Sequence, residues 1–275
     1  MKTVKHRLLL PMQAKGNVGK SLETATRACW LSECGVDWQG FDLDADNRTL
    51  SRLFPEQVRL VPMTGRAEDR DELVSILKKV TAKSITILDA RAHLDGVLQS
   101  ALQATRFFNL AKQLNIGITV TMFPLDDVDV MTNLDELCQF CGSQVDYVVV
   151  KNPARAARTR MFDGSQLEAE LKTLGAVTLT LPLLSEVVKM ELAYLENKHE
   201  RGIPFNEAIG SDDLQLDVMA RGMLQHWIGE MFSQYDRMAG RLLPTAEAEK
   251  IKPKPAPALG ETPRAKRGAK VNFAQ

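Results

Sequence analysis

The sequence has few cysteines, few aromatic residues, no net charge and no long apolar run. Its 275 residues include 4 cysteines, 6% are aromatic, and 35 Lys and Arg balance 35 Asp and Glu. So few cysteines exclude a disulfide-stapled scaffold and predict a reducing compartment, which we take to be the cytoplasm. A formal charge of +0 gives the whole molecule no net attraction to nucleic acid, so such binding would need a local patch.

The apolar segments are too short for a membrane protein. The run Leu8–Met12 is shorter than the apolar region of a secretory signal, and no stretch approaches the 18 or so apolar residues of a membrane span. We therefore expect no transmembrane segment. A composition of 44% hydrophobic and 25% charged residues is typical of a globular protein long enough for a sizeable core.

Short apolar runs alternate with longer amphipathic ones up to about residue 200, which is typical of βαβ units around a parallel sheet. We predict a doubly wound α/β fold with a mostly parallel sheet and helices on both faces. The predicted strands are Arg7–Met12, Trp38–Leu43, Arg59–Pro62, Ile85–Asp89, Ile116–Met122, Tyr147–Lys151 and Val177–Leu181. The predicted helices are Ser21–Glu33, Asp71–Val80, Val97–Leu114, Val128–Phe140, Ser165–Leu174, Leu184–Lys198 and Leu214–Leu242.

The end of the chain differs in composition from the rest. We predict one domain over residues 1–243, followed by a disordered, basic tail over 244–275 that is rich in Pro, Ala and Lys and has few large apolar side chains. Before it, the last predicted helix carries an apolar stripe, which indicates packing against the core or a second subunit. Its residues are Met219, Met223, Trp227, Met231 and Tyr235.

The most informative segment is Ala14-Lys15-Gly16-Asn17-Val18-Gly19-Lys20-Ser21, between the first predicted strand and helix. This context is that of a phosphate-binding loop, in which glycines let backbone N–H groups point at phosphate oxygens and the helix dipole adds to the attraction. The pattern predicts that residues 16–21 bind the phosphates of a nucleotide. Lys20 would reach the β- and γ-phosphates, and the Ser21 hydroxyl would bind Mg²⁺.

The standard motif has glycine where this chain has Ala14, so the loop instead resembles the deviant Walker A box, K-G-G-x-G-K-[ST], of the ParA/MinD family of ATPases. Asn17 replaces the second glycine of that box, and asparagine tolerates a left-handed backbone. The resemblance implies ATP and Mg²⁺ as cofactors and slow hydrolysis used as a timer. It also implies an ATP-dependent homodimer in which Lys15 reaches the phosphates of the other subunit.

Two further segments extend this resemblance to a magnesium site. Asp42 and Asp44 follow the second predicted strand, where family members carry a D-x-D switch motif. By resemblance, Asp42 lies near the Mg²⁺ and Asp44 positions the attacking water. Asp89 ends the strand Ile85–Asp89, as in a Walker B segment, and would hold Mg²⁺ through water. The implied metal set is therefore Ser21, Asp42 and Asp89.

Late strands supply the expected base-binding side of the site. Asn152 follows the strand Tyr147–Lys151, and by resemblance its amide pairs with the adenine edge. Pro182 follows the next predicted strand in a loop that would line the base. An asparagine before a proline is equally a turn former, so the order of these segments after the loop is what favours the nucleotide interpretation.

The working surface of such an ATPase is a separate question. Arg155, Arg158 and Arg160, together with the basic tail, are the candidate contacts for DNA bound without sequence preference. Among family members the chain is most similar to those that act in partition, stability or conjugation of plasmids and other mobile elements, with an unidentified partner protein. A membrane-binding amphipathic helix is less well supported, because Leu214–Leu242 has mixed charge.

Two other function classes stay open. Cys138 and Cys141 form a C-x-x-C pair, which in a metallocluster-assembly enzyme or a related metabolic ATP-dependent enzyme would hold a metal centre, although buried packing cysteines fit the pattern better. The other alternative is a nucleotide-binding adaptor that no longer hydrolyses ATP because of Asn17.

Overall fold

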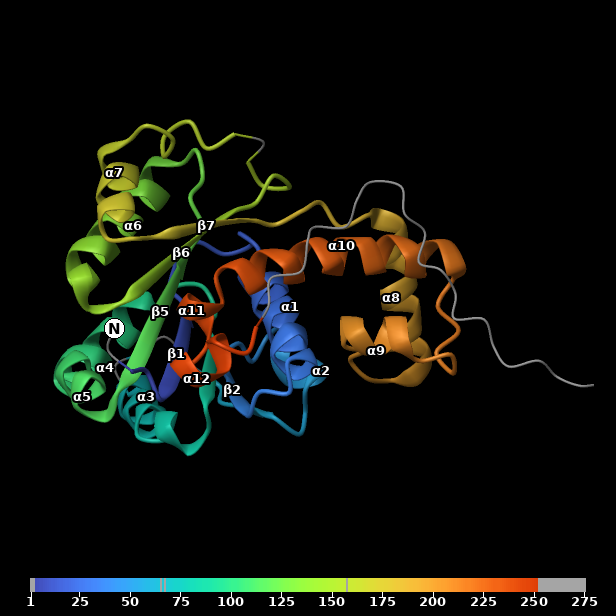
Figure 1. The fold of residues 1–275 in the computed structure, drawn as a ribbon, viewed down its shortest axis with the longest axis horizontal. Coiled ribbons are helices and arrows are strands. Elements are labelled where there is room, and N and C mark those ends of the chain that lie inside the picture. The colour runs from blue at the N-terminus through green and yellow to red at the C-terminus, as the bar shows by residue number, and fades with distance from the viewer. Residues whose placement is uncertain (1–2, 65, 67, 157, 252–275) are drawn as a thin grey trace, which may run out of the picture.

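A seven-stranded, all-parallel sheet forms the centre of the molecule (Figure 1). The computed structural model describes residues 3–64, 66, 68–156 and 158–251. The strand order is β3-β2-β4-β1-β5-β6-β7, so the chain winds outward on both sides of β1. The strands are β1 (His6–Pro11), β2 (Trp38–Asp42), β3 (Val58–Leu60), β4 (Ile85–Asp89), β5 (Ile116–Met122), β6 (Asp146–Lys151) and β7 (Val177–Thr180). Ligands of such sheets bind at the carboxyl ends of the strands, where the winding reverses.

Helices cover both faces of the sheet, and each face has its own hydrophobic core, which confirms the doubly wound α/β fold. One face is covered by α1 (Lys20–Glu33), α2 (Thr49–Leu53), α8 (Glu186–His199), α9 (Phe205–Gly210), α10 (Val218–Arg237) and α11 (Ala239–Leu242). The other is covered by α3 (Asp69–Leu77), α4 (Asp95–Ala104), α5 (Phe107–Leu114), α6 (Val128–Cys141) and α7 (Gln166–Thr173). Within the described ranges, no helix combines the length and apolar character needed to cross a bilayer.

The central strand β1 shows why these apolar runs form strands rather than helices. Leu8 and Leu10 pack into one core, and Leu9 packs into the core on the opposite face. Successive strand side chains point to opposite faces, so a strand buried on both sides needs an unbroken apolar run. The run Leu8-Leu9-Leu10 meets this need, with each side chain almost fully buried.

The helical boundaries differ from the expected ones in three places. The single helix expected over Val97–Leu114 is two helices, α4 and α5, because Arg106 between them adopts a left-handed φ of 47°. The helix expected over Leu214–Leu242 is shorter and is divided into α10 and α11 at Met238. Helices α2 and α9 were not predicted, since five or six residues carry too short a periodic pattern.

The folded chain continues past residue 243, where we expected the domain to end. Helix α12 (Thr245–Ala248) follows α11, and the Thr245 backbone N–H donates to the Val4 carbonyl at 2.9 Å. In return, the Val4 N–H donates to the Thr245 hydroxyl at 2.9 Å. Residues 244–251 therefore pack against the start of the chain. The rest of the expected tail, 252–275, lies outside the described residues.

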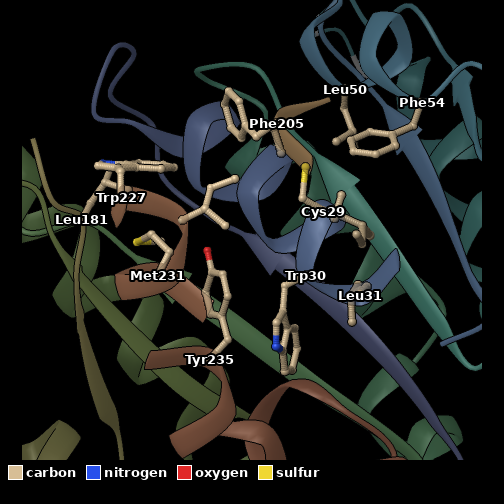
Figure 2. Close-up of a cluster of buried hydrophobic side chains, with 14 of the residues drawn as sticks. Cys29, Trp30, Leu31, Leu50, Phe54, Leu181, Phe205, Trp227, Met231 and Tyr235 are labelled. Atoms are coloured by element: carbon tan, nitrogen blue, oxygen red, sulfur yellow. The ribbon is translucent and has the colours of Figure 1, made fainter. Parts of the chain in front are cut away.

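The apolar stripe of the last long helix is buried over only part of its length. Figure 2 shows Trp227, Met231 and Tyr235 of α10 in the core beside α1, where the Tyr235 and Trp30 rings lie 5.4 Å apart. Met219, nearer the start of α10, is exposed at 73%. The stripe is therefore a core-packing face in its second half, and its first half is exposed in the single chain.

A buried arginine connects both ends of the folded chain to the middle of the sheet. Arg7 of β1 is 2% exposed and forms an ion pair with Asp146 of β6 at 2.7 Å. Its guanidinium also donates to the Thr119 hydroxyl and to three backbone carbonyls around α11. Those carbonyls belong to Gly240, Arg241 and Leu243. The guanidinium thus replaces water for carbonyl groups that the end of α11 leaves without helical partners.

We expect Arg7→Met to lower the free energy of unfolding by about 3 kcal/mol, because it leaves several buried acceptors without a donor. Urea unfolding measures the change. The matched control is Lys83→Met, which removes the exposed ion pair to Asp37 and is expected to cost less than about 1 kcal/mol. Equal, small losses in both variants would contradict the structural role of Arg7.

Candidate nucleotide-binding site

A cavity of about 1020 Å³ opens at the carboxyl ends of the central strands. It lies where β1 gives way to α1, which is the point predicted for the phosphates. Most of the predicted site residues line it together, although they come from four separate segments of the chain. These are Gly16, Asn17, Gly19, Lys20, Ser21, Asp44, Asn152 and Pro182. The sequence did not predict the other side of its rim, which includes Thr49, Leu183 and Lys189.

The phosphate-binding loop has two left-handed residues, Asn17 at φ 59° and Gly19 at φ 105°. Gly19 is the N-cap of α1, and a Cβ there would lie 2.6 Å from the Asn152 amide nitrogen. That amide donates to the Val18 carbonyl at 2.8 Å. Both the backbone angle and the close approach therefore require glycine at position 19. Asn17 adopts a left-handed backbone, which asparagine tolerates better than most other residues with a side chain.

Lys20 lies at the centre of the loop and is almost fully buried. Its ammonium donates to the Gln13 carbonyl at 3.2 Å and to the Lys15 carbonyl at 2.8 Å. Burial lowers the pKa of Lys20, and the negative charge of Asp89 opposes that shift. A buried cation that is held only by neutral carbonyls and by carboxylates at a distance favours the arrival of an anion.

A brace under the loop was not predicted. The Gln13 amide nitrogen donates to the Phe123 carbonyl, and the Phe123 N–H donates to the Gln13 amide oxygen, both at 2.9 Å. This pair ties the end of β1 to the end of β5. A lone glutamine before the motif carries no periodic or spacing signal, so the sequence could not have revealed it.

Two carboxylates meet under the cavity, as the metal prediction requires. Asp42 and Asp89 are register partners at the ends of β2 and β4, and both are buried. The Ser21 hydroxyl donates to Asp89 at 3.3 Å. Burial, and then the charge of Asp42, raises the pKa of Asp89 to about 7. Among the described residues, nothing donates a hydrogen bond to the second oxygen of Asp89.

These residues fit a divalent cation. Mg²⁺ prefers carboxylate, hydroxyl and water oxygens, and Ser21 and Asp89 offer such donors beneath the loop. An unpartnered, buried carboxylate oxygen is costly until a cation or a proton reaches it. Asp42 differs, because its oxygens already accept from the Asp44 N–H and from the N–H and hydroxyl of Ser51. Asp42 therefore fixes the backbone at Asp44 and Ser51, and it acts on Asp89 through its charge.

Asp44 presents a carboxylate to the cavity. Burial alone would raise the pKa of Asp44, but hydrogen bonds from Asn47 and Asp46 outweigh it and lower the pKa. The Asn47 side-chain amide is 2.8 Å from one carboxylate oxygen. Asp44 is therefore an ionised hydrogen-bond acceptor, which is the state needed to orient a water molecule. That role stays a prediction.

Lys15 points away from the cavity in the single chain. Its ammonium lies 3.1 Å from the carboxylate of Asp127, the N-cap residue of α6, and its side chain is 52% exposed. The Val130 N–H, followed by Lys15, lowers the pKa of Asp127. Nothing in the sequence indicated this partner. Lys15 thus lies at the rim of the site and can leave its partner at little cost, because exposed ion pairs are weak.

The base-side residues are occupied by contacts within the chain. Besides its bond to the Val18 carbonyl, the Asn152 side chain accepts a hydrogen bond from the Ala154 N–H at 3.1 Å. The Pro182 carbonyl accepts from the Trp227 indole of α10 at 2.8 Å. Asn152 therefore closes the phosphate-binding loop. The two bonds of Asn152 use one of the two N–H donors and one of the two acceptor lone pairs of its amide, and its contact with adenine stays a prediction.

The three arginines of the loop after β6 share one surface hollow but differ in their further contacts. Arg155, Arg158 and Arg160 are all exposed and line that hollow together. Arg158 and Arg160 also line a second hollow. Arg155 instead donates from its guanidinium to the Asn17 side chain and also lines the nucleotide cavity. No pattern in the sequence indicated this contact, because its two residues lie 138 positions apart.

The C-x-x-C pair is buried in the core on the α6 face. Cys138 and Cys141 are both 0% exposed, and burial is the main cause that raises the pKa of their thiols to about 11 and about 12. Thiolates bind metals, so thiols held protonated at neutral pH are poor ligands. Within the described ranges, no group of three or more His, Cys, Asp or Glu side chains is arranged to hold a metal ion.

We expect the contribution of Asp89 to the stability of the nucleotide- and magnesium-free protein to fall as the pH rises from about 4 to about 7. The folded-state pKa of Asp89 is raised, so the folded state keeps a proton that unfolding releases at these pH values. Asp89→Asn should melt several degrees above the unsubstituted protein at pH 8 and should match it at pH 4. Melting scans measure this, with Asp37→Asn at an exposed site as control. A stability gain from Asp89→Asn that is equal at both pH values would contradict the account.

No protein-family model and no curated protein matches this sequence. Among solved structures, it is similar to the septum site-determining protein MinD of Pyrococcus horikoshii with Mg-ADP, at 16% identity over 86% of this chain and 98% of that one, with a TM-score of 0.48. It is also similar to the MinC:MinD complex of Aquifex aeolicus, at 15% identity over 87% of this chain and 98% of that one, with a TM-score of 0.49. A nucleotide-binding protein of Archaeoglobus fulgidus with ADP is 14% identical over 68% of this chain and 85% of that one, with a TM-score of 0.42.

Proposed function

We propose that this chain is a ParA/MinD-like ATPase that binds ATP with Mg²⁺ and hydrolyses it as a switch between one-chain and two-chain states. The observation that carries the proposal is the loop between β1 and α1, where the left-handed Gly19 and the buried Lys20 adjoin the hydrogen-bonded pair Ser21 and Asp89. A buried lysine, a helix N-terminus and a carboxylate oxygen that accepts no hydrogen bond among the described residues meet at this point. A triphosphate with its cation satisfies all three.

Each residue has one task in this reaction. Backbone N–H groups of residues 16–21 hold the phosphate oxygens, and the Lys20 ammonium exchanges its carbonyl partners for them. Ser21 and Asp89 hold Mg²⁺, which, when bound, neutralises charge that develops on the transferred phosphoryl group. Asp44 accepts a hydrogen bond from the attacking water and aligns it with the γ-phosphate. The Asn47 amide keeps the Asp44 carboxylate in place.

The rim of the cavity supports dimerisation. Lys15 lies there with an exposed partner, Asp127, from which it can turn to a second chain. Leu183 also lines the cavity and is 66% exposed, and Met190 on α8 is 72% exposed. Apolar side chains exposed beside a nucleotide site gain free energy when a second subunit covers them. We therefore assign ATP the role of joining two chains through this rim.

The cargo that fits these residues best is DNA of a plasmid or other mobile element, engaged for partition, stability or transfer in the cytoplasm. Arg158 and Arg160 are exposed beside the cavity, where phosphate contacts would respond to the nucleotide state. The basic tail would add contacts of the same kind, and a partner protein would stimulate release. The metallocluster alternative has no such support, because Cys138 and Cys141 are buried in the core.

We expect ATP with Mg²⁺ to convert the protein from monomer to dimer in size-exclusion chromatography. Lys20→Ala should abolish this conversion because it removes the cation at the phosphates. Lys15→Ala should also abolish it, while nucleotide still binds, because the lysine acts across the interface. Lys5→Ala, an exposed lysine before β1, is the control. Dimers that persist in Lys15→Ala would remove the assignment of Lys15 to the second subunit.

We expect the ATP-bound protein to bind a random duplex with an affinity that falls about tenfold or more between low and physiological salt, because phosphate contacts release counterions. Arg158→Ala with Arg160→Ala should weaken binding and flatten the salt dependence. Fluorescence anisotropy at two salt concentrations measures both effects. Lys112→Ala, on α5 across the sheet, is the control. Binding that the paired substitution leaves unchanged would refute this surface.

A further inference from the structure

We propose that Arg155 binds the phosphate chain of the nucleotide held by its own subunit, and that Asn17 is the positioning residue that holds the guanidinium there. This inference rests on the proposed ATPase function and adds a second residue pair to its site. Arg155, which lines a surface hollow with Arg158 and Arg160 as well as the nucleotide cavity, would then serve the nucleotide site.

The backbone that carries Arg155 is fixed to the phosphate-binding loop. The N–H groups of Arg155 and Ala156 both donate to the Asn152 carbonyl at 3.0 Å, which forms a turn directly after β6. The Asn152 side chain donates in turn to the Val18 carbonyl. Position 155 is therefore tied through one residue to the middle of the loop, and it moves with that loop.

The Arg155 side chain makes a second contact with the loop, independent of the backbone contacts. Its Nη2 donates to the Asn17 side-chain oxygen, and both residues line the same cavity as Gly16 and Lys20. A guanidinium carries five N–H donors in a rigid plane, and this contact uses one of them. The plane suits two-point binding of phosphate oxygens, which is stronger than binding through one neutral donor. Held at the loop, the group has donors left for a phosphate.

Asn17 departs from the glycine that the deviant Walker A box has at this position. A glycine would take the same left-handed backbone at no cost, whereas asparagine accepts it with some strain. What asparagine adds is a side-chain oxygen, and that oxygen accepts the hydrogen bond from Arg155. The substitution and the arginine therefore form one unit, in which a second fixed cation joins Lys20 at the phosphates.

The experiment is calorimetric titration of the full chain with ATP and with ADP, both with Mg²⁺, together with steady-state hydrolysis. We expect Arg155→Ala to weaken ATP binding about tenfold or more, through lost charge-assisted hydrogen bonds. Arg155→Lys keeps the positive charge but loses the planar guanidinium donors, so its ATP affinity should lie between those of Arg155→Ala and the unsubstituted protein. Asn17→Gly should weaken binding less than Arg155→Ala and, combined with it, add nothing further. The matched control, Arg59→Ala at an exposed position on β3, should bind ATP like the unsubstituted protein.

The outcomes separate this inference from the function on which it rests. If the unsubstituted protein binds ATP, Lys20→Ala does not, and Arg155→Ala binds as tightly as Arg59→Ala, the inference is wrong and the ATPase proposal stands. Additive losses for Asn17→Gly and Arg155→Ala would contradict the role of Asn17. A loss with ATP but not ADP would assign Arg155 to the terminal phosphate, and equal losses would assign it to the inner ones. No heat with either nucleotide for the unsubstituted protein would overturn both proposals.

Discussion

The site depends on the shape of one loop, and that shape is held by its neighbours as well as by hydrogen bonds from Lys20 within the loop. Gln13 fixes the start of the loop to β5, and the Asn152 amide holds the Val18 carbonyl near its end. Gly19 fits against Asn152 where no side chain could. Because these contacts come from strands on one side of β1, the parallel order of the sheet is what forms the anion site. The buried Lys20 ammonium then donates to the Gln13 and Lys15 carbonyls.

Two buried ionisable side chains near this loop, Asp89 and Lys20, have unfavourable surroundings for their charged forms. Asp89 is buried beside Asp42 with an oxygen that lacks a donor among the described residues, and its pKa is raised to about 7. Lys20 has its pKa lowered by burial. In the proposed site, phosphates would pair with the lysine and a cation would pair with the carboxylate, so one binding event would remove both costs. The proposed switch would gain its driving force in this way.

The sequence predicted those features that depend on local pattern. Apolar runs such as Leu8–Leu10 indicated the strands, and the glycine spacing around Lys20 located the cavity, because turn geometry and strand burial follow from neighbouring residues. It could not predict contacts that fold closure creates, such as Lys15 with Asp127 or Arg155 with Asn17. Nor did it predict the break at Arg106, since an arginine carries no signal for a left-handed backbone. The functional roles assigned by resemblance stay predictions until they are measured.

The most direct measurement of the central claim is calorimetric titration of the purified chain with ATP, with Mg²⁺ present and with Mg²⁺ chelated. The account predicts one ATP per chain with Mg²⁺ and clearly weaker binding without it, because the cation relieves the buried Asp89 charge. Equal ATP affinity in both buffers would contradict the claim that Asp89, beside Asp42, holds a Mg²⁺ that accompanies the nucleotide. The absence of heat in either buffer would contradict the claim that residues 14–21 form a triphosphate site.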